Sequence, residues 1–297
     1  MNRTLLVTLC VVALSTALPC IAATTAYEGF SNGGNGADLQ GYSGGTAYGL
    51  TGVWDVTGPG AWRQDTINRT TGPLWFPNNV VYPRTNSGAD YQWAERNSGT
   101  HAWGDPSYAT RPLANSIDFG QDGTFYISYL ARMHSQQDSN MMVGLSDGTD
   151  LLTTGINYYS GTSRFGFSYG PTPPGTNTPG SADSGIPVTL SQSYFIVAEI
   201  KTQAAGPDTV SYKAYNSTSE LVHSDPSQLS GVGAGANQWT MQQTITASNV
   251  FDRLYAKADG PAYPNFDELR IGSTWTDVTG LDVGKYDRKI GLNFIGG

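Results

Sequence analysis

Two serines stand in the Gly-x-Ser-x-Gly spacing of a nucleophile elbow. They are Ser43, in Gly41-Tyr42-Ser43-Gly44-Gly45, and Ser146, in Gly144-Leu145-Ser146-Asp147-Gly148. Such a serine becomes a nucleophile where a strand turns sharply into a helix and a His accepts its proton. Neither serine is followed by a helix-forming sequence, and none of the three His residues has flanking residues that single it out as the base. The spacing therefore predicts two glycine turns, with an esterase as the alternative.

Paired carboxylates would support glycosidase chemistry, because these enzymes use one acid to protonate the leaving group and another as nucleophile or base. The glutamates of the chain are Glu28, Glu95, Glu199, Glu220 and Glu268. None stands in the spacing Glu-x-Asp-x-x-Glu, which would align three carboxylates along one strand face. Asp267 and Glu268 are adjacent, so strand alternation should point them to opposite faces. We expect one of them to pair with a basic neighbour such as Arg270, and Glu268 is the catalytic carboxylate candidate that remains.

A polysaccharide lyase would need a Tyr or His base beside Arg and an amide side chain. Tyr126, Tyr129, Arg132 and His134 follow one another along a single expected strand, although such a mixture is common. The sequence therefore leaves glycosidase, lyase and esterase activity open as alternatives and selects none of them.

Metal ligands are sparse in this chain. The three His residues are scattered and the two cysteines, Cys10 and Cys20, lie near the start, so no dense transition-metal site is expected. The turn Asp147-Gly148-Thr149-Asp150 brings two carboxylates and several backbone carbonyls into one tight loop, which suits calcium. Asp147 and Asp150 are therefore candidate calcium ligands, with solvated turn residues as the alternative interpretation. No other cofactor is indicated.

The tryptophans give the best lead to a ligand. Trp62, Trp75, Trp93 and Trp103 stand among Asn, Gly, Pro and Thr in loop-like sequence. Sugar rings present apolar C–H faces that stack on exposed aromatic rings, while nearby polar side chains bind the hydroxyls. These four residues are the predicted ligand-binding set. The alternative is that they cap the hydrophobic core.

Residues 1–23 have the form of an export signal. Arg3 precedes the apolar run 5–18, which is too short to span a bilayer comfortably, and Ala22 and Ala23 offer a cleavage site. Pro19 directly before Cys20 does not fit a lipidation site. Both cysteines would leave with the signal, so the mature chain would contain no disulfide. The sequence predicts a protein that is secreted, or held at the cell surface, without membrane insertion.

Composition and periodicity favour an all-β domain. The formal net charge of −8 argues against nucleic acid or an anionic membrane as partner. Apolar and polar residues alternate over 124–133, 164–169, 194–201 and 209–215, and turns such as Asp122-Gly123 separate these runs. Helical periodicity is nearly absent. The segment 170–187, rich in Pro and Gly, is expected to be a long exposed loop.

Several segments resemble the laminin-G-like, concanavalin A-like jelly rolls of secreted proteins from Planctomycetes and Verrucomicrobia. The most specific is residues 265–279, which contains Asp-Glu-Leu-Arg-Ile-Gly and is similar to their closing strand. Residues 27–30 resemble the first strand, 39–46 the turn after it, 125–130 with 143–148 a central hairpin, and 193–201 with 208–211 a late strand pair. The resemblance implies that the closing strand lies beside the first, and it implies extracellular placement and carbohydrate contact. The Pro-Glu-Pro sorting tail of many such proteins does not follow here.

These observations predict one antiparallel β-sandwich of jelly-roll type. The expected organisation is a signal peptide at 1–23, the sandwich at 24–284, and a tail at 285–297 that resembles the start of a second module. The expected function is a secreted glycan-binding or cell-surface interaction domain, with polysaccharide or a cell-surface glycan as partner. An extracellular enzyme on a polysaccharide or an ester is the alternative.

Overall fold

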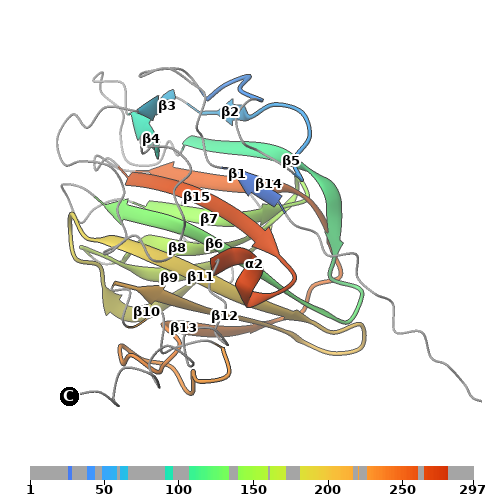
Figure 1. Ribbon diagram of the computed structural model, residues 1–297, viewed down its shortest axis with the longest axis vertical. Coiled ribbons are helices and arrows are strands. Elements are labelled where there is room, and N and C mark those ends of the chain that lie inside the picture. The colour runs from blue at the N-terminus through green and yellow to red at the C-terminus, as the bar shows by residue number, and fades with distance from the viewer. Residues whose placement is uncertain are drawn as a thin grey trace, which may run out of the picture.

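The structure is a computed structural model. It describes residues 26–28, 39–43, 49–58, 61–65, 91–95, 107–133, 140–159, 161–171, 181–216, 220, 226–259 and 264–279. For residues 61–65, 91–95, 107, 259, 264 and 265 only the backbone is described. The described strands form two antiparallel sheets packed face to face, as Figure 1 shows.

The first sheet has eight strands. Its spatial order is β13 (Met241–Ile245), β12 (Asp208–Tyr215), β11 (Ser193–Thr202), β6 (Gly123–Met133), β15 (Pro264–Gly272), β4 (Tyr91–Glu95) and β3 (Ala61–Asp65), and β1 (Ala26–Glu28) also pairs with β15. The second sheet has seven strands, in the order β10 (Ala182–Pro187), β9 (Thr162–Pro171), β8 (Asp150–Tyr159), β7 (Asn140–Ser146), β14 (Val250–Asp259), β5 (Ser107–Asp118) and β2 (Asp55–Thr57). In each sheet a late strand, β15 or β14, lies between strands from earlier in the chain. The predicted antiparallel β-sandwich of jelly-roll type is thus confirmed.

Strand alternation decides which residues build the core between the sheets. On β6 the core receives Ile127, Tyr129 and Ala131, and on β7 it receives Val143 and Leu145. The residues between them point to the outer face of each sheet. Removal of these side chains from water supplies the main favourable free energy of the fold.

Two core tyrosines tie the sheets together with hydrogen bonds. The hydroxyl of Tyr129 donates to the carbonyl of Thr154 at 2.7 Å, and the hydroxyl of Tyr212 donates to the carbonyl of Gly166 at 3.0 Å. Both tyrosines come from the eight-stranded sheet and both carbonyls from the seven-stranded sheet. Burial raises the pKa of both phenols, so they remain protonated donors at any physiological pH.

The first strand is held at three successive residues. Ala26, Tyr27 and Glu28 pair with β15 in antiparallel register, which confirms the expected neighbourhood of the first and closing strands. Glu28 is fully buried, and its carboxylate accepts hydrogen bonds from the Arg111 guanidinium on β5 and from Trp54 Nε1 at 3.1 Å. A short N-terminal strand is therefore anchored to the opposite sheet by a buried ion pair.

Two local expectations need correction, and a third is confirmed. β6 and β7 lie in different sheets, so 125–130 and 143–148 do not form the expected central hairpin. Residues 182–187, expected within a loop, form the edge strand β10, where Pro187 is tolerated next to a register shift. The expected late hairpin of β11 and β12 is present, with Phe195 opposite Tyr215 and Lys201 opposite Thr209.

A short helix follows the closing strand. Helix α2 (Trp275–Thr279) begins with a capping box, in which Thr274 Oγ1 accepts the Asp277 N–H at 3.2 Å and the Asp277 carboxylate accepts the Thr274 N–H at 2.9 Å. The Val278 carbonyl accepts the Ser128 hydroxyl at 2.7 Å. The helix thus packs on the outer face of the eight-stranded sheet (Figure 1). Within the described ranges, no helix is long and apolar enough to cross a membrane.

Candidate functional site

The four predicted tryptophans are only partly placed. Trp62 lies on β3 opposite Ala94, and Trp93 lies on β4 opposite Asn265 of β15. Their side chains are not described, and Trp75 and Trp103 lie outside the described residues. The binding role of all four stays a prediction.

The two candidate serines lie in different settings. Ser43 is exposed, and its carbonyl accepts a hydrogen bond from Arg111 at 3.0 Å. Ser146 ends β7 and is buried, and its hydroxyl accepts the Gly148 N–H at 2.9 Å. The segment after Ser146 is a turn followed by strand β8, not the helix of a nucleophile elbow. All three His residues lie outside the described residues, so their distances to the serines stay untested.

Glu268 lies on a bulge of the closing strand. It has a positive φ of 53°, and the register between β15 and β6 shifts between Asp267 and Arg270. Strict alternation, which the sequence argument assumed for Asp267 and Glu268, is therefore interrupted. Glu268 pairs with Arg270 at 3.1 Å as expected, and the Arg270 guanidinium lies over the ring of Tyr27 at 4.8 Å from its centroid. These contacts hold β1 against β15.

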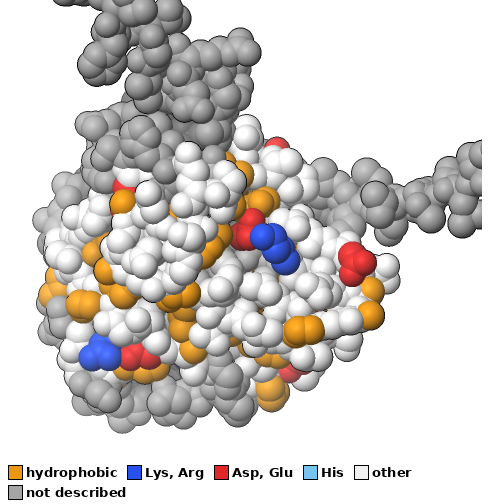
Figure 2. Space-filling view, turned by 90° about the horizontal axis from the view of Figure 1, so that it is seen from below, with side chains coloured by type: hydrophobic (Ala, Val, Ile, Leu, Met, Phe, Trp, Pro, Cys, Tyr) orange, Lys and Arg blue, Asp and Glu red, His pale blue; other side chains and the backbone are white. Residues whose placement is uncertain are grey.

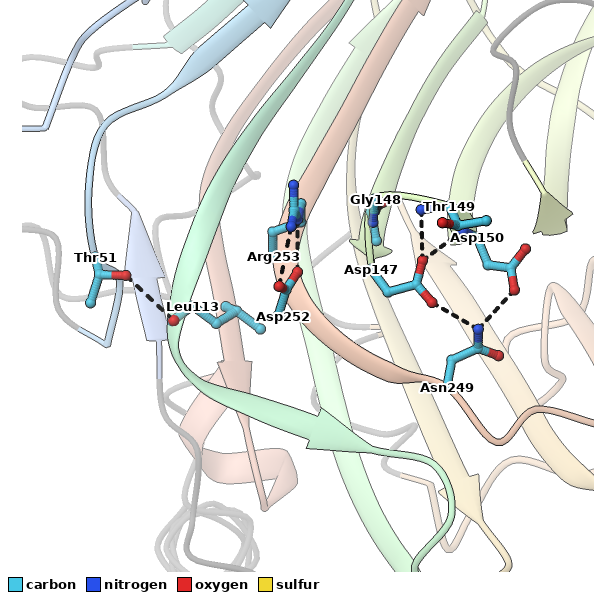
Figure 3. Close-up of polar contacts among 10 residues, drawn as sticks. Thr51, Leu113, Asp147, Gly148, Thr149, Asp150, Asn249, Asp252 and Arg253 are labelled. Atoms are coloured by element: carbon cyan, nitrogen blue, oxygen red, sulfur yellow. Dashed lines mark hydrogen bonds and ion pairs between the residues drawn. The ribbon is translucent and has the colours of Figure 1, made fainter.

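The two candidate calcium ligands, Asp147 and Asp150, accept hydrogen bonds from the same side-chain amide. Asn249, just before β14, donates from Nδ2 to Asp147 at 2.8 Å and to Asp150 at 2.7 Å (Figure 3). The other Asp147 oxygen accepts the N–H groups of Thr149 and Asp150, both at 2.7 Å. Burial alone would raise the pKa of Asp147, but these hydrogen bonds outweigh it and lower the pKa. The described part of the chain contains no group of three or more His, Cys, Asp or Glu side chains placed to hold a metal ion.

The residues considered for a lyase separate onto two faces. Tyr129 points into the core, whereas Tyr126 and Arg132 lie on the opposite face of β6, and His134 is outside the described residues. Tyr126 donates to Glu199 at 3.0 Å and packs edge-on against Trp275 of α2. Tyr129 therefore cannot serve a site on the outer face of this sheet.

The arrangement best suited to a ligand lies on the outer face of β2, β5 and β14. Register aligns Thr57, Tyr108 and Lys257 in one cross-strand row, and Asp55, Thr110 and Tyr255 in the next. We call these six residues the tyrosine face. Their neighbours in sequence, such as Ala109 and Ala256, point into the core. Asp55 and Thr57 are exposed, and Tyr108, Thr110 and Lys257 are half-buried, so hydroxyl, charged and aromatic groups share one accessible surface.

The ring of Tyr108 stacks against the ring of Tyr255. Their ring centroids are 5.7 Å apart with an interplanar angle of 24°, a stacked arrangement, and Tyr255 keeps only 2% of its surface exposed. The backbone next to the face is fixed as well, because Gln40 accepts the Val56 N–H at 2.6 Å and reaches Asp55 at 3.5 Å. A half-exposed ring on a rigid support loses little entropy when a ligand stacks on it.

Sequence reasoning missed the tyrosine face because it searched among tryptophans. The available signal was the two-residue spacing of Tyr108 with Thr110 and of Tyr255 with Lys257, which places each pair on one side of a strand. That these two strands are neighbours, and that their polar sides coincide, depends on pairing across almost 150 residues of chain.

Comparison with known proteins finds similar folds and no family. No protein-family model matches the chain, and no curated protein matches it. Among solved structures, the endo-β-1,4-glucuronan lyase of the fungus Trichoderma reesei is similar at 10% identity and a TM-score of 0.38, over 72% of this chain and 92% of that one. The carbohydrate recognition domain of Emp47p is similar at 7% identity and a TM-score of 0.37, over 84% and 95%. The globular domain of T. cruzi calreticulin is similar at 8% identity and a TM-score of 0.37, over 77% and 90%. Identities this low say nothing about shared site residues.

Proposed function

We propose that the protein is a secreted glycan-binding or cell-surface interaction domain that binds a sugar chain on the tyrosine face. The observation that carries the proposal is the half-buried ring of Tyr108, stacked on Tyr255 and bordered by Thr110, Asp55 and Lys257. An aromatic plane surrounded by hydroxyl and charged groups matches the two surfaces of a sugar, its C–H face and its hydroxyl rim.

The sparse charge of the protein supports a sugar over a charged polymer. Only 13% of the residues are charged, and the net charge is −8. On the face seen in Figure 2, charged side chains are few, and the basic ones lie beside acidic ones. Described pairs of this kind are Arg164 with Asp183 and Lys201 with Glu199. Such a surface offers little long-range attraction to polyanions.

The proposal extends to the family of the domain and to its location outside the cell. Residues 265–279 resemble the closing strand of the secreted laminin-G-like jelly rolls, and residues 1–23 have the form of a signal peptide. Accordingly, we place the mature domain at 24–284, with 285–297 as a tail, outside the cell or at its surface. The mass of the protein exported by a bacterial host checks the cleavage, which should follow Ala22 or Ala23.

A polysaccharide lyase is the second candidate. Cross-strand register aligns Trp93, Asn265, Arg132 and Ser193 in one row of the eight-stranded sheet. Arg132 belongs to the face opposite the core, because its neighbours Ala131 and Met133 are core residues. Arginine and an amide in one row would suit the carboxylate of a uronic acid. Release of unsaturated oligosaccharides from a polyuronate, detected by mass spectrometry, would favour this candidate over the binding domain.

Retention on insoluble polysaccharides tests the proposal. The mature protein is mixed with cellulose, curdlan, xylan and chitin, and the bound fraction and any soluble products are measured. Tyr108→Ala should weaken retention about three- to tenfold, since an aromatic contact contributes roughly 0.5–1.5 kcal/mol. Tyr126→Ala is the matched control and should leave retention unchanged. Tyr126 is also a half-buried tyrosine in contact with an aromatic ring, but it lies on the eight-stranded sheet, away from the tyrosine face.

Two results would contradict the proposal in different ways. If the wild type is retained by none of the four polysaccharides and releases no products, the protein is not a binder of this kind. If the wild type is retained and Tyr108→Ala is retained equally well, the ligand lies elsewhere on the molecule.

A further inference from the structure

The hydroxyl of Tyr255 is buried without a hydrogen-bond partner. Tyr255 keeps 2% of its surface exposed, and its Oη is among the few buried side-chain atoms of the described residues that lack a partner. The buried tyrosines Tyr129 and Tyr212 each donate to a carbonyl. An unpaired buried hydroxyl destabilises a fold, and Phe would fill the same space without this penalty. Its presence calls for an explanation outside stability.

Tyr255 lies on the outer face of its sheet, not in the core between the sheets. Its neighbours Leu254 and Ala256 belong to the core, so Tyr255 points to the outer face. Register places it between Thr110 of β5 and Gly144 of β7. The side chain of Thr110 therefore points to the same outer face as Tyr255. Gly144, on the other side, has no side chain.

Gly144 places no side chain beside Tyr255 and is itself buried. A Cβ atom added there would lie 1.9 Å from the Leu152 carbonyl oxygen, so no other residue fits without displacement of backbone. On the other side, the half-exposed ring of Tyr108 stacks over Tyr255. Among the described side chains, Tyr108 is the aromatic ring in contact with Tyr255, so a shift of this ring is the change that we consider for exposing the hydroxyl.

We propose that Tyr255 is a specificity-determining residue, whose hydroxyl bonds a hydroxyl of an uncharged polysaccharide when the ligand stacks on and shifts Tyr108. The inference rests on the proposed function and adds a ligand class and a deep contact to the same site. The ligand is uncharged because the tyrosine face carries one acidic and one basic residue, Asp55 and Lys257, in a chain of net charge −8. Burial raises the pKa of Tyr255, which keeps the hydroxyl neutral.

This arrangement links a loss of stability to a gain in recognition. In the free protein the hydroxyl is unpaired, and in the complex the sugar satisfies it, so the hydrogen bond counts fully toward binding. A sugar that lacks the matching hydroxyl would leave Tyr255 unpaired and bind less tightly. Sites that sacrifice stability for function in this way are common in proteins.

Three variants test the inference against the wild type. Titration calorimetry measures affinity for the hexasaccharide of the polysaccharide that retains the wild type, such as cellohexaose for cellulose or laminarihexaose for curdlan, and calorimetric scanning measures the melting temperature. Tyr255→Phe should weaken binding roughly three- to tenfold, while its melting temperature equals or exceeds that of the wild type. Tyr212→Phe, the matched control, should bind normally and melt lower, because it loses its hydrogen bond to Gly166. Tyr108→Ala measures how much the ring of Tyr108 contributes to the affinity.

The outcomes separate this inference from the proposed function. If Tyr108→Ala loses affinity and Tyr255→Phe keeps it, the glycan site stands and the role of Tyr255 is refuted. If Tyr255→Phe melts below the wild type, its hydroxyl has a partner in the free protein and the inference also fails. Retention of the wild type by none of the four polysaccharides contradicts the proposed function, and with it the uncharged ligand class.

Discussion

The buried ion pair between Glu28 and Arg111 should control the stability of the N-terminal part of the fold. Glu28 is 0% exposed and Arg111 is 3% exposed, so solvent hardly screens their charges. Arg111→Met would leave the carboxylate buried without its cation, which typically costs about 3–5 kcal/mol. It would also remove the hydrogen bond from Arg111 to the Ser43 carbonyl. The loss is a large fraction of the roughly 5–15 kcal/mol that stabilise a typical domain.

A second variant separates the charge from the packing. In Glu28→Gln combined with Arg111→Met, the pair becomes neutral and the Gln oxygen still accepts the hydrogen bond from Trp54 Nε1. Because no unpaired charge is then buried, the double variant should be more stable than Arg111→Met alone, by about 1–3 kcal/mol. The difference between the two variants measures the uncompensated charge and not the lost contacts.

Urea unfolding followed by tryptophan fluorescence measures these free energies. For a domain of this size a loss of 1 kcal/mol lowers the melting temperature by about 2–4 °C, so Arg111→Met should melt roughly 6–20 °C below the wild type. Arg164→Met is the control, because Arg164 forms a partly exposed pair with Asp183 and should lose less than about 1 kcal/mol. Equal losses in Arg111→Met and Arg164→Met, or a double variant no more stable than Arg111→Met, would refute the reasoning.

Three shorter predictions concern other parts of the molecule. The lowered pKa of Asp147 means that its carboxylate stabilises the fold above the unfolded pKa of about 4, and that this contribution is lost as the pH falls through the lower folded pKa. Asp147→Ala should therefore melt below the wild type at pH 6, and the two curves should converge in acid. The melting temperature should be the same in calcium and in EDTA, since Asn249 already satisfies both carboxylates; a calcium-dependent rise that Asp150→Asn abolishes would establish the ion. Tyr129→Phe should cost about 1–3 kcal/mol in urea unfolding, because it leaves the buried Thr154 carbonyl without this donor, and an unchanged midpoint would show that the bond does not stabilise the fold.

Local alternation was a sound guide to the strands and to their buried sides. The run from residue 124 to 133 alternates, and its odd-numbered members Ile127, Tyr129 and Ala131 enter the core. The bond between Glu268 and Arg270 followed from their closeness on one strand. Helix α2 could also have been read from the sequence, because Thr274 and Asp277 have capping-box spacing. Each of these features depends on residues a few positions apart.

Partners across the sheets were beyond the reach of such signals. Nothing in the local pattern separates a β6–β7 hairpin from the observed arrangement, in which the two strands lie in different sheets. Nor does it show that Asn249 lies between Asp147 and Asp150, about a hundred residues away in sequence. Both outcomes depend on the free energy of whole sheets, to which many weak contacts contribute together.

By itself, the sequence determined the fold class and the buried sides of the strands, because these follow from periodicity and composition, whereas the export signal stays a prediction. Only the tertiary structure decided the tyrosine face. Tyr108 and Tyr255 both stand on the polar side of an alternating strand, yet one is half exposed and the other buried with an unpaired hydroxyl. Exposure is set by what packs next to a side chain, and the stacking of these rings depends on strands far apart in the chain.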